Sequence, residues 1–167
     1  MPEPIVIKEG AIFIADSHEN ENRKNFLRFL YALKSGEIKT PQLFLMGDMF
    51  DFLAAQCEFF VKFYERYVRA IDELGEEMEI YYFEGNHDFN LAPLFKNVKV
   101  YSIGAQPVKF ASECDQSVLI AHGDIFLPFV SKYALRFLRV KIFLKTMNFF
   151  DKFLNFRLSK RILNKLK

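Results

Sequence analysis

The sequence of 167 residues contains no tryptophan, two cysteines and three histidines. Cys57 and Cys114 lie far apart, in neither the spacing of a zinc site nor that of a redox motif, which excludes a disulfide framework and fits a reducing compartment. The opening residues, MPEPIVIKEG, lack the basic and apolar regions of a secretory signal, and no stretch approaches the roughly 18 uncharged apolar residues that a membrane span needs. These absences predict a cytoplasmic protein.

The residues that are present predict one folded domain with two unlike parts. Hydrophobic residues make up 51% of the chain, which is enough for a substantial core. Residues 1–124 carry 12 Lys and Arg against 20 Asp and Glu, whereas residues 125–167 carry 11 Lys and Arg against Asp151 alone. An acidic body followed by a basic tail indicates that the tail faces an anionic surface.

The first part of the body alternates strands with helices. Apolar runs at 11–15, 43–46 and 79–83 each end abruptly in a polar loop, as buried strands do. Segments 21–36 and 56–74 have apolar residues at helical spacing and end near glycines, so each is predicted to be one helix.

The second part of the body is richer in strands. Residues 98–102, 106–111 and 117–124 predict three short strands, with a turn at 112–116. Together with the alternating first part, this pattern predicts an α/β fold.

The tail predicts two amphipathic helices joined near 146–148. Between 131 and 145, Leu138 and Ile142 lie on one helical face and basic residues lie on another. Asn148, followed three residues later by Asp151, resembles an N-cap with an acid in the first turn, so a second helix is expected to begin there. Its apolar residues then recur every four positions.

Aspartate, histidine and asparagine gather in the loops that follow the predicted strands. Because the carboxyl ends of neighbouring strands face a common crevice, these loops are expected to converge. Any one such side chain is commonly just a solvated loop residue, but carboxylate, imidazole and amide groups together, without thiolate, suit Mn²⁺, Fe²⁺ or Zn²⁺. The set is Asp16 and His18, Asp48 and Asp51, Asn86 and His87, and His122 with Asp124.

The order of these loops resembles that of the calcineurin-like metallophosphoesterases, whose motifs are D-x-H, G-D-x-x-D, G-N-H-D/E, a later His, and G-H-x-H. The chain has DSH at 16–18, GDMFD at 47–51, GNHD at 85–88 and HGD at 122–124. Within the family it is most similar to the UDP-2,3-diacylglucosamine diphosphatases of lipid A synthesis, through GDMFDF, GNHDF and the basic aromatic segment after HGD. The resemblance implies a four-layer α-β-β-α sandwich, with 1–124 as the metallophosphoesterase core.

The resemblance also implies a dinuclear metal centre, most simply of manganese. Two cations about 4 Å apart can hold the phosphoryl oxygens and offset the charge that builds up in an in-line displacement. One ion would bind Asp16, His18 and Asp48, and the other Asp48, Asn86 and His122.

The remaining loop residues receive supporting roles from the same resemblance. His87 would lie near the phosphate and donate a proton or a hydrogen bond. Asp51 and Asp88 would orient the loop backbone or His87 by hydrogen bonds. Which residues bind the rest of the substrate is not predicted.

The chain departs from the family pattern because no G-H-x-H motif, and no histidine at all, follows His122. Waters could complete each metal's ligands, at a cost in affinity. We expect the chain to be incomplete at its C-terminus, with a missing part that returns to the site. The alternative is a naturally short, weak or inactive relative.

The tail, residues 125–167, is predicted to belong to the same domain and to serve as a lid or a membrane-facing segment. Its basic face opposite a Phe and Leu face describes an interfacial helix, although a helical pair packed on the body explains the pattern equally well. Nothing in it resembles a nucleic-acid-binding module, so no nucleic-acid partner is expected.

The leading hypothesis is therefore hydrolysis of UDP-2,3-diacylglucosamine to UMP and 2,3-diacylglucosamine 1-phosphate, by a cytoplasmic protein that is peripheral on the inner membrane. One alternative keeps the metal site but takes a soluble nucleotide phosphodiester as substrate. Another is an inactive relative that acts as a binding module.

Overall fold

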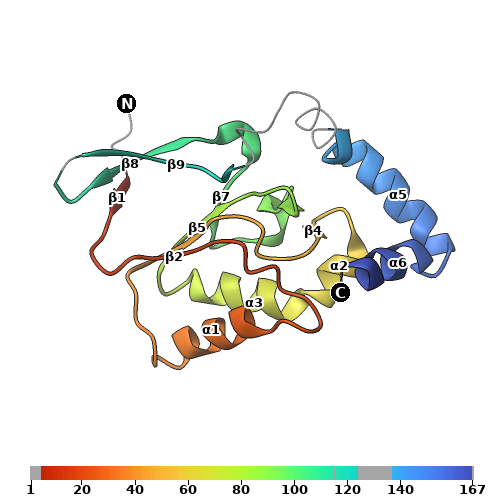
Figure 1. Ribbon diagram of the computed structural model, residues 1–167, viewed down its shortest axis with the longest axis horizontal. Coiled ribbons are helices and arrows are strands. Elements are labelled where there is room, and N and C mark those ends of the chain that lie inside the picture. The colour runs from red at the N-terminus through yellow and green to blue at the C-terminus, as the bar shows by residue number, and fades with distance from the viewer. Residues whose placement is uncertain (1–4, 115, 124–136, 167) are drawn as a thin grey trace.

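A computed structural model describes residues 5–114, 116–123 and 137–166 of the chain (Figure 1). The predicted Asp124 and residues 125–136 of the tail lie outside the described residues. The described part confirms the α/β class, with two main sheets and helices on one side of them.

The larger sheet is parallel and has the strand order β2-β3-β5-β7. Its strands are β2 (Ile12–Ile14), β3 (Gln42–Leu45), β5 (Glu79–Phe83) and β7 (Lys99–Tyr101). β2, β5 and β7 fall within predicted strand segments, and β3 begins one residue before its predicted run at 43–46. In β3 every residue is buried, as expected of a strand covered on both faces.

Helices α1 (Asn25–Lys34) and α3 (Glu65–Leu74) pack against one face of this sheet (Figure 1). Their buried positions, such as Leu30 and Ile71, recur at helical spacing and join the main core with Leu43 of β3. This core fixes the sheet and therefore the strand ends where the polar loops begin.

The other face of the sheet packs against a second sheet of order β1-β8-β9. Its strands are β1 (Ile5–Ile7), β8 (Val108–Ser112) and β9 (Ser117–Ile120), of which β1 was not predicted. Phe44, Tyr81, Phe83, Phe110 and Ile120 form an aromatic-rich core between the two sheets. Helices and two sheets thus make three of the four expected layers in the part of the chain that the structure describes.

The segment predicted as one helix over 56–74 is two helices, α2 (Glu58–Phe63) and α3, so that prediction was wrong in its continuity. The break lies at Tyr64, whose φ and ψ of −99° and 14° leave the helical range. Tyr64 is buried and its hydroxyl donates to the carbonyl oxygen of Glu19 at 2.8 Å, which ties the break to the loop after β2.

The tail forms α5 (Lys141–Phe153) and α6 (Arg157–Lys165), so the predicted break near 146–148 was wrong. Asn148 lies inside α5 and its Oδ1 accepts a hydrogen bond from the first backbone N–H of α2, on Glu58, at 3.0 Å. Asp151 lies in the last turn of α5, and its carboxylate accepts hydrogen bonds from the first turn of α6. It therefore caps the following helix rather than its own.

Short elements complete the described part of the chain: the parallel pair β4 (Leu53–Ala54) and β6 (Asp88–Phe89), and the 3₁₀ turns η1 (Ala92–Leu94) and η2 (Ile103–Ala105). The β4–β6 pair joins the chain just after the second polar loop to the end of the third. No helix within the described ranges is long and apolar enough to cross a bilayer.

Candidate metal centre

Three polar loops meet at the carboxyl ends of β2, β3 and β5, as the sequence predicted. Possible ligand atoms of Asp16, His18 and Asp48 all lie within 4.8 Å of one another. Backbone hydrogen bonds hold the first loop against the second, from Asp16 N to Gly47 O at 3.2 Å and from His18 N to Asp48 O at 3.1 Å. The three side chains therefore form a compact carboxylate and imidazole group that fits a divalent ion.

The same three residues have an uncommon backbone conformation. Their φ angles are 52° for Asp16, 43° for His18 and 52° for Asp48, in the left-handed region. Asp and His enter this region more readily than most residues, but each such residue still costs on the order of 1 kcal/mol. The hydrogen bonds between the loops hold this conformation and so fix the directions of the side chains.

Asp48 is the buried centre of the site, with a relative exposure of 5%. Its Oδ1 accepts a hydrogen bond from the backbone N–H of His87 at 2.9 Å, and its Oδ2 lies 3.5 Å from Nε2 of His122. Burial acts to raise the pKa of this carboxyl, but the interactions with His122 and His87 outweigh burial and leave the pKa below its ordinary value. Asp48 is therefore an anion at neutral pH.

His122 presents one ring nitrogen to the Asp48 carboxylate. Its Nδ1 lies 2.8 Å from the carbonyl oxygen of Met46, which can only accept, so Nδ1 carries the proton. Its Nε2 faces the Asp48 carboxylate, so this nitrogen is the one that would bind an ion there, with Nδ1 held by a backbone carbonyl as is usual for a metal-binding histidine. Gln106, which the sequence did not single out, accepts a hydrogen bond from the His122 backbone N–H at 2.7 Å.

Asn86 and His122 line one surface hollow of about 500 Å³ together with Asp16 and Asp48. The structure thus brings all five predicted metal ligands to one place, since His18 lies beside Asp16 and Asp48. Asp48 lies between the Asp16–His18 side and the His122 side, as a shared ligand requires.

His87 stands at the edge of this group. Its Nδ1 donates to the carbonyl oxygen of Asp51 at 2.7 Å, so Nε2 is left for a substrate. The carboxylate of Asp51 accepts hydrogen bonds from Asn20 at 2.6 Å and Arg23 at 3.0 Å, and it lies 3.4 Å from Nδ1 of His18. Asp51 therefore orients both histidines, one through its backbone and the other through its side chain.

Asp88 holds two of the loops together from beneath. It has no exposed surface, and its carboxylate accepts from the backbone N–H groups of Asp48, Met49 and Gly85 and from the Tyr82 hydroxyl, at 2.6–3.0 Å. Burial raises the pKa of Asp88 to about 7, with Asp48 adding to the shift and the hydrogen bonds opposing it.

Two motif glycines leave room for these contacts. A Cβ on Gly85 would lie 2.2 Å from Oδ1 of Asp48, and one on Gly47 would lie 2.6 Å from Nδ1 of His122. Gly47 also has a φ of 85°. Larger residues at either position would displace a candidate ligand.

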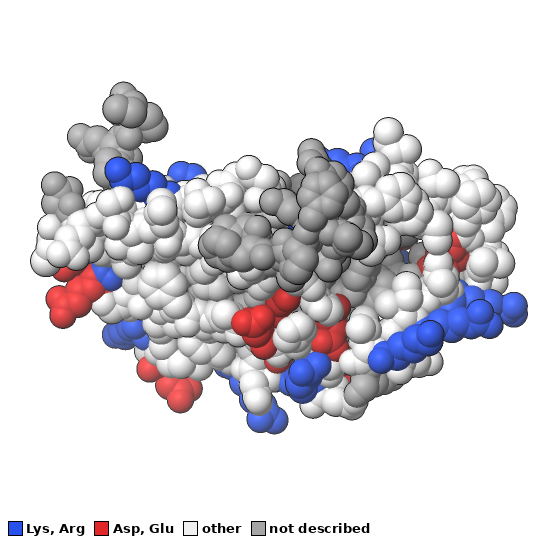
Figure 2. All heavy atoms as spheres, turned by 45° about the horizontal axis from the view of Figure 1, so that its top comes forward, with Lys and Arg blue, Asp and Glu red and all other residues white. Residues whose placement is uncertain are grey.

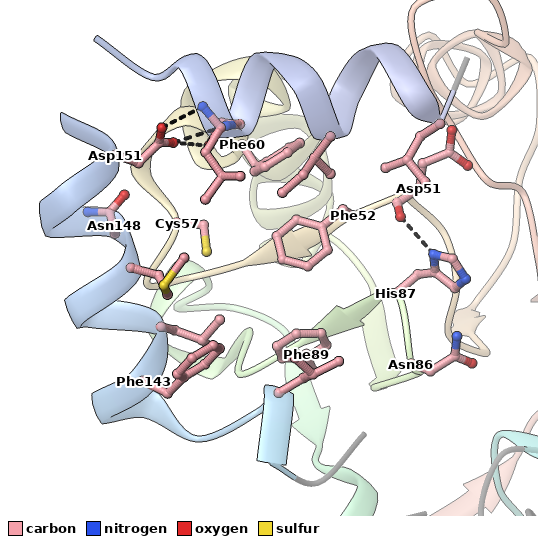
Figure 3. Close-up of a pocket in the computed structure, with 17 residues that line it drawn as sticks. Asp51, Phe52, Cys57, Phe60, Asn86, His87, Phe89, Phe143, Asn148 and Asp151 are labelled. Carbon is pink, nitrogen blue, oxygen red and sulfur yellow. Dashed lines mark hydrogen bonds between the residues drawn. The ribbon is translucent and has the colours of Figure 1, made fainter. Parts of the chain in front are cut away.

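An apolar cavity of about 590 Å³ opens beside the candidate metal centre (Figure 3). Phe52, Phe89 and Phe143 point into it, while His87 and Asn86 stand at the end nearest the polar loops (Figure 3). The sequence analysis assigned no cavity residues, although Phe52 and Phe89 belong to the GDMFDF and GNHDF motifs, and the wall on the far side comes from α5 and α6 of the tail. Other lining residues are Cys57, Phe60, Leu138, Leu144, Met147, Leu158, Ile162 and Leu166.

Comparison with known proteins agrees with this geometry. A family model described as calcineurin-like phosphoesterase matches residues 11–163. The chain is 29% identical over 119 residues to a UDP-2,3-diacylglucosamine hydrolase of Aromatoleum aromaticum (strain DSM 19018 / LMG 30748 / EbN1), covering 70% of this chain and 47% of that protein. It is 26% identical over 114 residues to a protein of the same name from Coxiella burnetii (strain Dugway 5J108-111), covering 68% of this chain and 46% of that one.

The chain thus spans about half the length of the curated relatives that it matches. The family model, in contrast, extends over most of the chain and includes every loop of the candidate metal centre. This protein therefore belongs to the calcineurin-like phosphoesterases, a family of metal-dependent phosphohydrolases.

Proposed function

We propose that this protein hydrolyses a phosphoester or pyrophosphate bond with two divalent metal ions held in the candidate metal centre. Asp16, His18 and Asp48 would hold one ion, and Asp48, Asn86 and His122 the other. The observation that carries the proposal is the approach of three ligand groups to within 4.8 Å, with Nε2 of His122 lying 3.5 Å from the carboxylate of Asp48. Manganese is the proposed metal, with iron or zinc as alternatives that accept the same ligands.

The side chains around the centre have distinct tasks in this reaction. When bound, the two ions supply positive charge that holds phosphoryl oxygens and offsets the charge developing during displacement at phosphorus. His87, fixed by the hydrogen bond from its Nδ1 to the Asp51 carbonyl, would present Nε2 to the leaving group and, as an imidazolium, donate its Nε2 proton to it. Asp88 fixes the loops of Asp48 and Gly85 relative to each other, because its carboxylate accepts hydrogen bonds from both backbone N–H groups.

We further propose UDP-2,3-diacylglucosamine as the substrate, cleaved to UMP and 2,3-diacylglucosamine 1-phosphate. The names of both relatives support this substrate class. The apolar cavity next to His87 supports it independently, because a soluble nucleotide has no group that would fill such a space. A substrate with two acyl chains resides in a bilayer, so the protein would act at the cytoplasmic face of the inner membrane.

The test compares UDP-2,3-diacylglucosamine with a UDP-sugar that lacks acyl chains, in the presence of Mn²⁺. We expect UMP release from the acylated substrate, and a loss of about 100-fold or more in Asp48→Asn, which removes the shared charge. Equal rates on both substrates would favour the soluble-nucleotide alternative. Hydrolysis of neither substrate would overturn the proposal, and absence of tight Mn²⁺ binding as well would favour a metal-free binding module.

A further inference from the structure

Helix α5 has apolar residues on two opposite faces. The inward face carries Leu144 and Met147, which line the cavity beside the candidate metal centre. The outward face carries Ile142, Phe149 and Phe153, spaced seven and four residues apart, with relative exposures of 77%, 57% and 75%. A helix that packs only on its own protein has a polar outward face, so packing within the described part of the chain does not explain this second face.

The charged residues that α5 itself places beside the outward face are all basic, and one of them, Lys152, pairs with Glu58 of α2. Lys141, Lys145 and Lys152, at spacings of four and seven, form a row along one flank of α5. The one acidic residue of 137–166 is Asp151, which is 4% exposed and caps α6 from the inward side. Figure 2 shows the resulting run of basic side chains along the end of the molecule that α5 and α6 form.

The exposed charges on α6 are also basic. Its basic residues are exposed, and no acidic residue alternates with them along the helix: Arg157, Lys160, Arg161 and Lys165. A second copy of the chain, docking by the same face, would bring these basic rows together, which is unfavourable. An apolar ridge bordered by cations fits an anionic lipid surface, where rings enter the acyl boundary and amines meet the headgroups.

We propose that the outward face of α5, formed by Ile142, Phe149 and Phe153 and flanked by the lysine row, docks on an anionic lipid bilayer. The proposal deepens the proposed function and rests on it for its biological purpose, since the inward face of the same helix walls the cavity. A lipid substrate leaving the bilayer would therefore pass one helix diameter to reach the cavity, about 10 Å. Binding to vesicles, however, requires no catalysis.

The test is flotation of the whole chain with vesicles of phosphatidylcholine alone or with about one third phosphatidylglycerol. We expect binding to the anionic vesicles, weakened by salt, and an affinity about tenfold lower in Phe149→Ser/Phe153→Ser. Lys145→Glu should lower affinity by a similar factor. Matched controls are Leu119→Ser, an exposed apolar residue on β9, and Lys109→Glu, an exposed basic residue on β8, which should bind as the unmodified chain does.

Three results would overturn the proposal. The first is no flotation with anionic vesicles at low salt, and the second is an equal loss of binding in the α5 variants and their controls. The third is a dimer in solution that Phe149→Ser/Phe153→Ser converts to a monomer, which would make the face an interface between copies. Asp48→Asn separates the two proposals, because this variant should lose hydrolysis and keep vesicle binding. Conversely, the unmodified chain and the α5 variants should hydrolyse the soluble ester bis-p-nitrophenyl phosphate at equal rates.

Discussion

Asp151→Asn tests how the cavity wall is built. The buried carboxylate of Asp151 accepts from Leu158 N at 2.8 Å through Oδ1, and from Ser159 N at 3.1 Å and Ser159 Oγ at 2.5 Å through Oδ2. These donors lie in the first turn of α6, whose N-terminal N–H groups have no partner within the helix. An asparagine has one acceptor oxygen, so it can serve only one of the two sides.

Both orientations of the asparagine leave one donor unpaired. With its oxygen toward Leu158, its amide faces the Ser159 N–H, although the Ser159 hydroxyl can turn and accept. With its oxygen toward Ser159, the Leu158 N–H loses its acceptor. One unsatisfied buried N–H costs about 1–3 kcal/mol. A helix of nine residues is not stable alone, so the cost should appear as a local opening of α6 that becomes about 5- to 150-fold more frequent.

Hydrogen exchange measures this opening directly. We expect the amides of α6 to lose protection by that factor in Asp151→Asn, while the amides of α1 keep theirs. Ser159→Ala is the matched control, because it removes only the hydroxyl and leaves both backbone donors paired, so it should have a clearly smaller effect. Unchanged protection of α6, or an equal loss in α1 and α6, would refute the reasoning.

Other predictions concern the loops and the cysteines. Gly85→Ala should weaken Mn²⁺ binding in a calorimetric titration, because its Cβ would meet Asp48, whereas Gly104→Ala, with no atom within 4 Å of the new Cβ, should bind Mn²⁺ as before. Comparable weakening in both would count against the close approach. Burial raises the pKa of the Cys57 thiol to about 11, so iodoacetamide should label the exposed Cys114 first at pH 7.5, and labelling of Cys57 should rise about tenfold per pH unit up to that pKa. Mass spectrometry of the labelled peptides measures both rates, and early labelling of Cys57 would contradict its burial.

The ligand loops could be predicted because their information is local. Asp16 and Asp48 each follow an apolar run, and parallel strands bring such loops to one edge without further detail. The convergence of the third loop follows from the same rule. Family motifs then supplied the division of the ligands between two ions, which spacing alone did not fix.

The helical tail could not be predicted in detail because its information is not local. Asn148 has the composition of an N-cap, yet its side chain caps α2, about ninety residues earlier in the chain. Asp151 has the position of a first-turn acid, yet it serves α6. Exposed Phe153 and buried Leu144 are equally apolar, so periodicity could not tell which face of α5 packs on the body. These choices depend on which surfaces the rest of the fold leaves open.

The central claim is that Asp48 is shared by two metal ions, and manganese anomalous diffraction tests it most directly. In crystals grown with Mn²⁺ we expect two anomalous peaks about 4 Å apart, one beside Asp16, His18 and Asp48 and the other beside Asp48, Asn86 and His122. Manganese bound elsewhere on the protein, with no peak at Asp48, would contradict the account.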